Sequence, residues 1–187
     1  MNTKSLLIDT ATSLFQQKGY KNVGLNEILK ACNVTKGALY HHFPNGKEEL
    51  LITCLHGLNE AITTDIEAIF NRYPSAEDAI LSMIDKLVHS FEQNGTIIGY
   101  TFSSIVSEMA TMSEPVRTAC NALYENLQHL YCKKLLTNGY SDESASAMAL
   151  LLTASIEGAM MLCLTQKSAK PLKTVAELLP SILKVNN

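Results

Sequence analysis

The stretch that decides the fold lies near the N-terminus and reads Asn26-Glu27-Ile28-Leu29-Lys30-Ala31-Cys32-Asn33-Val34-Thr35-Lys36-Gly37-Ala38-Leu39-Tyr40-His41-His42-Phe43. Asn26 is a predicted N-cap of a short helix that ends at Cys32. Asn33-Val34 is then a tight break, and Thr35 is a predicted N-cap of a second short helix that runs to about Phe43. Two short helices joined by a tight turn are typical of a helix-turn-helix.

The second helix of this pair carries most of the polar chemistry. If Leu39 and Phe43 face inward together with Ile28, the opposite face presents Lys36, Gly37, Tyr40 and His41. A glycine costs a helix about 1 kcal/mol relative to alanine, so Gly37 suggests that another molecule approaches the backbone closely. The aromatic and imidazole groups, with His42 among them, can donate to phosphate or stack on sugar and base edges. The pattern alone leaves two interpretations, a DNA-reading helix or a small hairpin with ordinary surface residues.

Charge is divided unevenly along the 187 residues, whose formal net charge is −3. Residues 1–50 hold six lysines against four acidic residues, a net charge of +2. Residues 51–187 hold nine basic and fourteen acidic residues, a net charge of −5. The whole chain is therefore a poor candidate for a general polyanion binder, but its N-terminal part is suited to meet phosphate.

Helical periodicity extends over almost the whole chain, beginning with a stripe of Leu7, Ala11, Leu14 and Phe15 that should end near Gly19. Asn45-Gly46-Lys47-Glu48 has the spacing of a capping box and should open a long helix to about Asn71. Further helices are expected from Ser75 towards Gln93, from Ser113 to Leu136, after the cap Ser141 and after Pro171, with an apolar stretch from Thr96 to Met112. No alternating strand pattern or internal repeat is evident. The expected fold is all-α, with about nine helices.

One expected helix, Ala145 to Thr165, is apolar or small throughout except for Glu157. A charge at the centre of a bilayer costs about 2.5–3.5 kcal/mol, which argues against a membrane span. The small residues Ala147, Ala154 and Gly158 lie at helical spacing and would let another helix come close. We expect this helix to pack on a core with one face and on a partner subunit with the other, with no membrane involved.

Three motifs together resemble the TetR family of bacterial repressors: Gly24-Leu25-Asn26-Glu27-Ile28, Gly37-Ala38-Leu39-Tyr40-His41-His42-Phe43 and Gly46-Lys47-Glu48-Glu49-Leu50. This resemblance covers roughly residues 5–55. A closer resemblance, to the lincomycin and multidrug resistance repressor branch, covers most of the chain. It rests on Phe43-Pro44-Asn45-Gly46-Lys47, Ser113-Glu114-Pro115-Val116-Arg117, Lys134-Leu135-Leu136-Thr137-Asn138-Gly139 and Ile156-Glu157-Gly158-Ala159-Met160-Met161.

The family resemblance implies a three-helix DNA-binding domain at residues 1–46 and a larger helical domain at residues 47–187 that binds a small-molecule inducer and dimerises. It also implies a set of DNA contacts: Asn26, which would cap onto a phosphate, and Thr35, Lys36, Gly37, Tyr40, His41, His42 and Lys47. The chain departs from the family at Cys32-Asn33, where Ala-Gly is usual, but Asn tolerates the left-handed turn conformation. The linker Pro44-Asn45-Gly46 is one residue longer than usual, which leaves the role of Lys47 open.

Candidate ligand residues in the larger domain are aromatic groups and methionines, which suit adaptable apolar pockets. They are Phe91, Tyr100, Phe102, Met109, Met112, Tyr124, Tyr131, Met148 and Met160. Most such residues serve as core, and we expect about one in three to touch a ligand. The branch resemblance implies an aromatic or drug-like inducer.

Enzymatic and metal-dependent functions find no support in the sequence. The five cysteines are widely spaced without a Cys-x-x-Cys, as expected for reduced thiols in the cytoplasm. His129 and Cys132 have metal-ligand spacing on a helix but lack a third ligand. No signal peptide, phosphate-binding loop or catalytic motif is evident, so we expect no cofactor, no metal and no enzyme activity.

Two hypotheses from different classes follow. In the first, the chain is a cytoplasmic, dimeric repressor that binds palindromic operator DNA and is released by an effector, with the last two helices of each subunit forming the dimer interface. In the second, it is a small-molecule binding module whose N-terminal hairpin binds a protein rather than DNA. An enzyme that uses His129 or a thiol is a remote third hypothesis.

Overall fold

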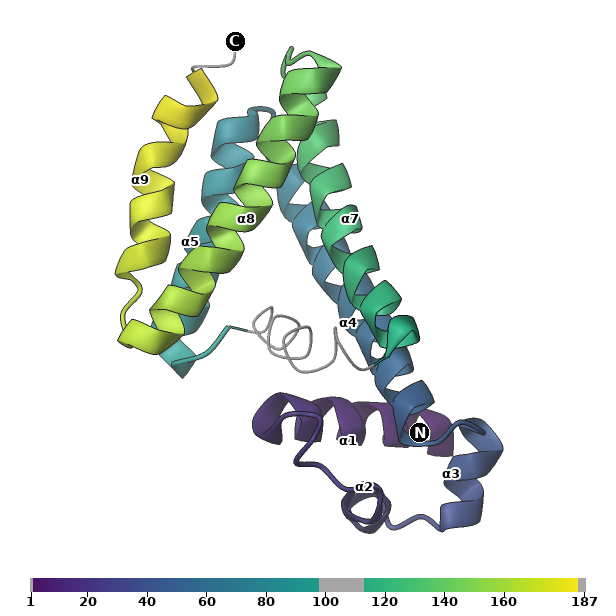
Figure 1. Ribbon diagram of the computed structural model, residues 1–187. Helices are drawn as coiled ribbons and strands as arrows, with labels where there is room; N and C mark the ends of the chain where they lie inside the picture. The colour runs from purple at the N-terminus through teal and green to yellow at the C-terminus, as the bar shows by residue number, and fades with distance from the viewer. Residues whose placement is uncertain (1, 98–112, 185–187) are drawn as a thin grey trace. The chain divides into compact units, whose positions relative to one another are not determined.

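The computed structural model describes residues 2–97 and 113–184 and contains only helices over these ranges (Figure 1). The eight helices are α1 (Thr3–Lys18), α2 (Leu25–Cys32), α3 (Lys36–His42), α4 (Lys47–Phe70), α5 (Ala76–Asn94), α7 (Glu114–Leu136), α8 (Asp142–Gln166) and α9 (Lys170–Lys184). The all-α prediction is confirmed. Most of the apolar stretch from Thr96 to Met112, the site of the ninth expected helix, lies outside the described residues.

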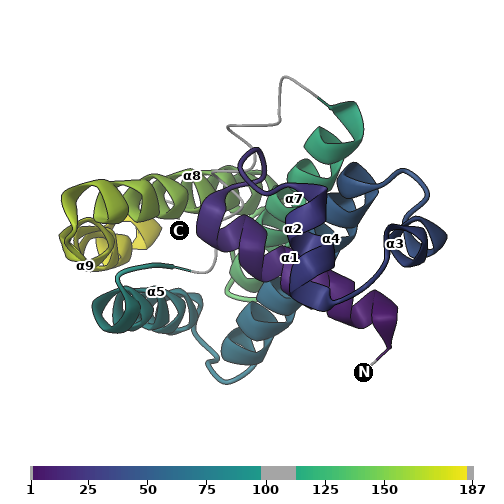
Figure 2. The ribbon, with the colours of Figure 1, turned by 90° about the horizontal axis from the view of Figure 1, so that it is seen from below.

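The chain forms two compact units, an N-terminal unit (residues 1–60 and 101–122) and a C-terminal unit (residues 61–100 and 123–187). In the N-terminal unit, α1 packs against both α2 and α3 (Figure 2). Its core contains Leu7, Ala11 and Phe15 of the predicted stripe, while Leu14 is half-buried. Ile28 of α2 and Leu39 of α3 are also inaccessible to solvent, and because α1 packs against both helices, the three short helices share one apolar centre.

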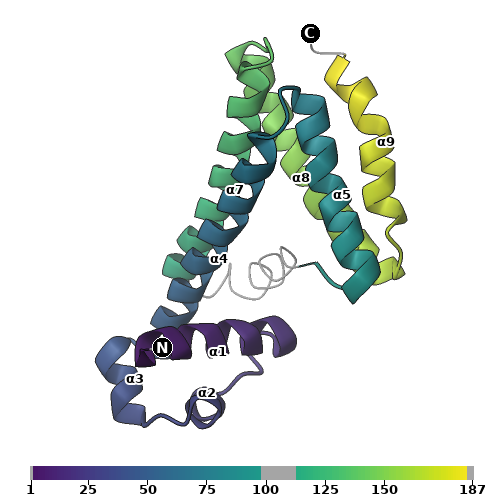
Figure 3. The same ribbon diagram turned by 180° about the vertical axis from the view of Figure 1, so that it is seen from behind.

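In the C-terminal unit, α9 packs on α5 and on α8 (Figure 3). Lys173 of α9 forms an ion pair with Glu92 of α5 at 2.7 Å, and the Tyr140 hydroxyl donates to the Leu183 carbonyl. The turn between α4 and α5 is held by the end of α7: Asn138 accepts a hydrogen bond from the Ala76 N–H, and its amide donates to the Pro74 carbonyl. Polar contacts thus fix the ends of helices whose inner faces are apolar.

Several helix boundaries follow local rules that the sequence displays. Ser75 and Ser141 cap α5 and α8, each through a side-chain oxygen that accepts from the N–H three residues on. Gly19 follows α1, and Gly95 ends α5 with a φ of 65°. Pro171 differs slightly from expectation because it lies inside the first turn of α9, which begins at Lys170, where a missing N–H costs no helical hydrogen bond.

By length and composition, α8 is able to cross a membrane, but 44% of its most apolar window is buried inside the structure. Its buried side includes Met148, Leu152 and Ile156. Its other side exposes a row of apolar and small residues: Ala147, Leu150, Leu151, Ala154, Gly158, Met161 and Leu162. We call this row the outer α8 face. It forms a continuous apolar surface, whereas exposed apolar side chains on a protein surface are normally scattered singly.

The five cysteines are free thiols, and all but Cys132 are buried. Burial raises the pKa of Cys54 and of Cys120 to about 11. A raised pKa disfavours the thiolate, and at pH 8 roughly one thiol in a thousand is ionised when its pKa lies three units higher.

We therefore expect iodoacetamide at pH 8 to modify Cys132 first, with Cys54 and Cys120 protected until the protein unfolds. Mass spectrometry of peptides from a time course measures this order, and a sample in guanidinium chloride gives the unprotected rates. Equal modification rates for Cys54 and Cys132 in the folded protein would contradict the described packing.

Candidate nucleic-acid interface

The turn between α2 and α3 has the geometry expected of a helix-turn-helix. Asn33 ends α2 in the left-handed conformation, with φ 52° and ψ 45°, as predicted for the residue that replaces the usual glycine. The Val34 N–H donates to the Leu29 carbonyl at 3.0 Å, which closes the turn. Thr35 then caps α3, since its hydroxyl oxygen accepts from the Ala38 N–H at 3.2 Å. The predicted break and second N-cap are confirmed.

Helix α3 has one buried and one exposed side. Leu39 and Phe43 are almost fully buried, as the pattern predicted. The exposed side presents Lys36, Gly37, Tyr40 and His41, with Thr35 exposed at its start and His42 half-buried. The His41 and His42 rings meet edge to face with their centroids 5.0 Å apart. Burying Leu39 and Phe43 contributes about 1.5–3 kcal/mol each, so the exposed side is presented by a firmly seated helix.

Gly37 has no reason within the chain to be a glycine. A Cβ atom built there would come no nearer than 3.9 Å to any neighbour, the closest being the Thr35 hydroxyl oxygen. Its φ does not lie in the left-handed region. Because glycine weakens a helix relative to alanine, the contacts of the described residues do not account for a glycine at this position.

Tyr40 is the large aromatic group of the exposed side, with 41% of its surface accessible. Its ring lies beside Gly46, where a Cβ atom would stand 3.4 Å from the ring carbon Cε1. Gly46 has a φ of +69°, which favours glycine at this position. The Lys36 ammonium lies 5.7 Å from the Tyr40 ring centroid. Gly46 therefore supports the Tyr40 ring, a role that was not predicted from the sequence, although the Pro44-Asn45-Gly46 turn was a signal for it.

The prediction that Asn26 caps α2 is wrong. Gly24 occupies the N-cap position, with φ −79° and ψ 151°, and its carbonyl accepts from the Ile28 N–H at 3.3 Å. Leu25 is already helical, so Asn26 is the second residue of the helix and its side chain is exposed. As a glycine, Gly24 has no side chain that could cap the helix. A phosphate contact by Asn26 would therefore come from a side chain on the first turn rather than from a capping residue.

The start of α4 also differs in detail from the expected capping box. The helix begins at Lys47, and the carboxylate that reaches back belongs to Glu49, which accepts from the Asn45 N–H at 2.8 Å. Glu48 instead accepts from the Ser113 hydroxyl at 2.9 Å. Gly46 precedes the helix and accepts from the Leu50 N–H, which moves the pairing on by one residue.

The contacts of Lys47 are with Tyr20 rather than with the exposed side of α3. Its ammonium donates to the Tyr20 carbonyl at 2.6 Å and lies 3.9 Å from the centroid of the Tyr20 ring. The side chain is half-buried. The structure thus brings together the α3 residues expected at a nucleic-acid interface, while the ammonium of Lys47 contacts the segment after α1.

Family comparisons agree with this arrangement. Residues 7–54 match the model described as bacterial regulatory proteins of the tetR family. Residues 76–178, more than half of the chain, match the C-terminal domain of LmrA/YxaF-like transcriptional regulators. The chain belongs to the TetR family. It is a transcriptional regulator, as its helix-turn-helix and the resemblance of its motifs predicted.

Two relatives of this TetR-family regulator come from Bacillus subtilis strain 168. The HTH-type transcriptional regulator YxaF is 34% identical over 98% of this chain and 96% of its own length. The HTH-type transcriptional regulator LmrA is 32% identical over 98% of this chain and 97% of its own length. Among solved structures, the reduced form of Escherichia coli NemR matches with a TM-score of 0.88 and 25% identity, covering 97% of each chain.

The candidate ligand residues of the regulator divide into two groups. Tyr100, Phe102, Met109 and Met112 lie outside the described residues. Of the others, Phe91, Tyr131, Met148 and Met160 are buried and Tyr124 is half-buried. Burial, and secondarily the charge of Glu157, raises the pKa of Tyr131. Its hydroxyl therefore remains a proton donor at neutral pH and donates to the Met83 sulfur at 3.4 Å.

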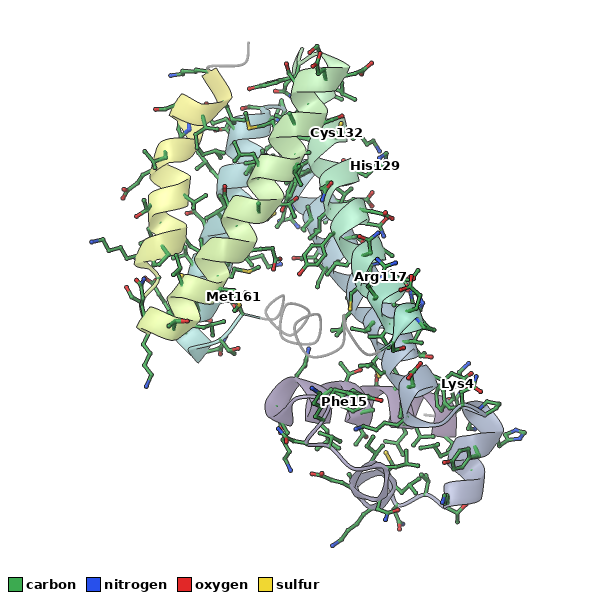
Figure 4. The ribbon with its side chains drawn as sticks, viewed as in Figure 1. Lys4, Phe15, Arg117, His129, Cys132 and Met161 are labelled. Carbon is green, nitrogen blue, oxygen red and sulfur yellow. The ribbon has the colours of Figure 1, made fainter. Side chains whose placement is uncertain are left out.

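His129 and Cys132 both come from α7 (Figure 4). His129 is exposed, and the Cys132 sulfur lies 3.8 Å from the Ser146 hydroxyl oxygen. Within residues 2–97 and 113–184, no three His, Cys, Asp or Glu side chains gather in a way that could hold a metal ion.

Proposed function

We propose that this regulator is a cytoplasmic repressor that binds a palindromic operator as a dimer and is released by a small effector. In this proposal residues 1–46 form the DNA-binding domain and residues 47–187 the ligand-binding and dimerisation domain. The observation that carries the proposal is the exposed side of α3, where Lys36, Gly37, Tyr40 and His41 stand on the buried base of Leu39 and Phe43. A short helix with such a face is suited to enter a major groove.

The direct contacts proposed are those of α3 and its cap, joined by Asn26 at the edge. Lys47, which the family resemblance also placed among the DNA contacts, is considered separately because its ammonium donates to the Tyr20 carbonyl. Lys36 suits a phosphate or a guanine edge, and Tyr40, His41 and His42 suit phosphate, sugar and base edges. The positive net charge of residues 1–50 favours this end of the chain for DNA, while the acidic remainder disfavours it. A dimer would place two such helices on successive half-sites of the operator.

The outer α8 face, together with α9, supports the proposed dimer. Leu178 of α9 is 53% exposed and adds to the apolar residues of α8. Ala147, Ala154 and Gly158 would let a helix of a second copy approach closely. A second copy covers this face without the cost of placing Glu157 in a bilayer. In this proposal α8 and α9 of both subunits form a four-helix interface.

The effector is proposed to be aromatic or drug-like and to bind among the apolar side chains of the larger domain. Buried Phe91, Met148 and Met160 and the Tyr131 hydroxyl offer the chemistry such a molecule needs. Release requires that the effector bind more tightly to a state that fits the operator poorly, so its differential affinity for the two states limits derepression. No catalytic role is proposed.

The experiment is fluorescence anisotropy with the purified protein and a labelled duplex from upstream of its own gene. We expect sequence-selective binding whose affinity falls steeply with salt. Tyr40→Ala should weaken binding at least tenfold, while Tyr73→Ala is the matched control because Tyr73 is exposed to a similar extent, 37%, in the C-terminal unit. Aromatic compounds that release the duplex identify the effector class.

Wild-type protein that binds the duplex no better than a scrambled one would overturn the repressor proposal. Full DNA binding by the Tyr40→Ala variant would show that the exposed side of α3 does not recognise the DNA. Retained effector binding without any DNA binding would favour a small-molecule binding module with a protein-interaction head.

A further inference from the structure

Lys47 makes contacts that a simple phosphate-binding lysine does not need. It is the first residue of α4, and its ammonium donates to the Tyr20 carbonyl at 2.6 Å. The same ammonium lies 3.9 Å from the Tyr20 ring centroid and 5.9 Å from that of Phe15, which belongs to α1 (Figure 4). The two rings pack against each other at 5.4 Å. A cation on aromatic faces that also donates to a carbonyl is held in one place.

The Tyr20 carbonyl, which accepts from the Lys47 ammonium, also accepts a backbone hydrogen bond. It accepts from the Val23 N–H at 3.3 Å and so begins the turn that connects α1 to α2. The turn leads into Gly24, the N-cap of α2, and Val23 is fully buried. Position and orientation at the start of α2 therefore depend on where the Tyr20 carbonyl lies. Lys47 fixes that carbonyl from α4, a helix that follows α3 in the chain.

Glu48 strengthens this interpretation from the next position along the chain. Its carboxylate binds the Ser113 hydroxyl, and its charge adds to burial in raising the pKa of Tyr20. The phenol next to the Lys47 ammonium therefore stays neutral. The first two residues of α4 thus connect two other segments of the N-terminal unit, the turn after α1 and the residue before α7.

We propose that Lys47 is a positioning residue, which supports DNA binding by holding Tyr20 and the start of α2 rather than by touching a phosphate. The proposal rests on the DNA-binding function and assigns Lys47 a role different from that of Lys36. An ammonium that moved towards a phosphate would lose part of its contact with the Tyr20 carbonyl and the two rings. Lys36, whose side chain is exposed on α3, needs no such rearrangement.

The test compares wild type, Lys47→Ala, Lys47→Met, Tyr20→Leu, the double variant Tyr20→Leu/Lys47→Met and Lys36→Ala on the upstream duplex at several salt concentrations. Lys47→Met keeps the apolar stem against the rings and guards against a variant that fails to fold. We expect both Lys47 variants to weaken binding three- to tenfold with an unchanged slope of affinity against salt. Lys36→Ala should lower that slope by about 0.9 for each phosphate that the lysine neutralises in the wild-type complex.

The double variant adds a second readout. If Lys47 acts through Tyr20, the double variant loses no more affinity than the weaker-binding of the two single variants. In the absence of DNA, amides 20–24 should also exchange hydrogen faster in Lys47→Met than in wild type. A reduced salt slope for Lys47→Met, or affinity losses that multiply in the double variant, would overturn the proposal. If the wild-type protein shows no selective DNA binding, the proposed function is overturned instead. Hydrogen exchange of amides 20–24 in Lys47→Met would then still test whether Lys47 holds the Tyr20 carbonyl.

Discussion

Replacing Gly37 with leucine is expected to abolish operator binding while leaving the protein folded and at least as stable as wild type. Gly37 is exposed, and a Cβ atom built there finds the Thr35 hydroxyl oxygen, at 3.9 Å, as its nearest neighbour beyond its own stretch of helix, so we expect a side chain to be tolerated in the free protein. Leucine is a better helix former than glycine by up to about 1 kcal/mol, which should raise the unfolding temperature slightly. In the groove the same side chain would stand where the DNA must approach, and we expect operator affinity to fall at least a hundredfold.

Two measurements on one protein check this prediction, thermal unfolding followed by circular dichroism and anisotropy on the upstream duplex. Gly57→Leu is the matched control, because Gly57 is an exposed glycine of α4 with no neighbour within 4 Å of a built Cβ. It should gain similar helix stability and keep its DNA affinity. Wild-type affinity in Gly37→Leu would mean that nothing approaches the backbone of α3 closely.

A charge on the outer α8 face is expected to dissociate the proposed dimer. Leu150 and Leu162 are 57% and 49% exposed in the single chain. Burying one leucine contributes about 1.5–3 kcal/mol, and a two-fold interface contains each position twice. Leu150→Glu removes that contribution and adds the cost of desolvating two carboxylates. We expect the dimer dissociation constant to rise at least a hundredfold, with operator affinity falling in parallel.

Sedimentation velocity across a range of protein concentrations measures the change in the monomer–dimer equilibrium. Leu136→Glu is the control, since Leu136 is 39% exposed at the end of α7 and lies outside α8 and α9. It should remain dimeric. A Leu150→Glu protein that stays dimeric and binds the operator normally would place the interface elsewhere.

The parts of the fold that could be predicted are those set by neighbours in the sequence. Thr35, Ser75 and Ser141 cap helices because a short polar side chain can reach an N–H three residues on. Asn33 adopts the left-handed turn because its side chain tolerates that backbone better than most. The two faces of α3 follow from helical spacing alone. Such local rules need no knowledge of what lies across the molecule.

The errors and omissions have a different physical origin. Asn26 and Gly24 are both acceptable N-caps, and the choice between them depends on how α2 packs. The Lys47 ammonium contacts a carbonyl 27 residues earlier in the chain, which no spacing rule reveals. The partner of Asn45 is Glu49 rather than Glu48 because α4 begins at Lys47, with Gly46 rather than Asn45 directly before it. The N-cap of α2 and the hydrogen-bond partners of Lys47 and Asn45 depend on packing and on the exact residue at which each helix begins. The sequence shows which residues are able to make these contacts but not which of them do.

The outer α8 face has a consequence for gene dosage. If two chains must meet before either half-site is held firmly, operator occupancy at low expression follows the square of the chain concentration rather than the concentration itself. A small fall in synthesis would then empty the operator more than proportionally, and an unpaired chain would expose the leucines of α8 to the quality-control proteases of the cell. The same residues would thus set both the threshold of repression and the lifetime of the surplus chain.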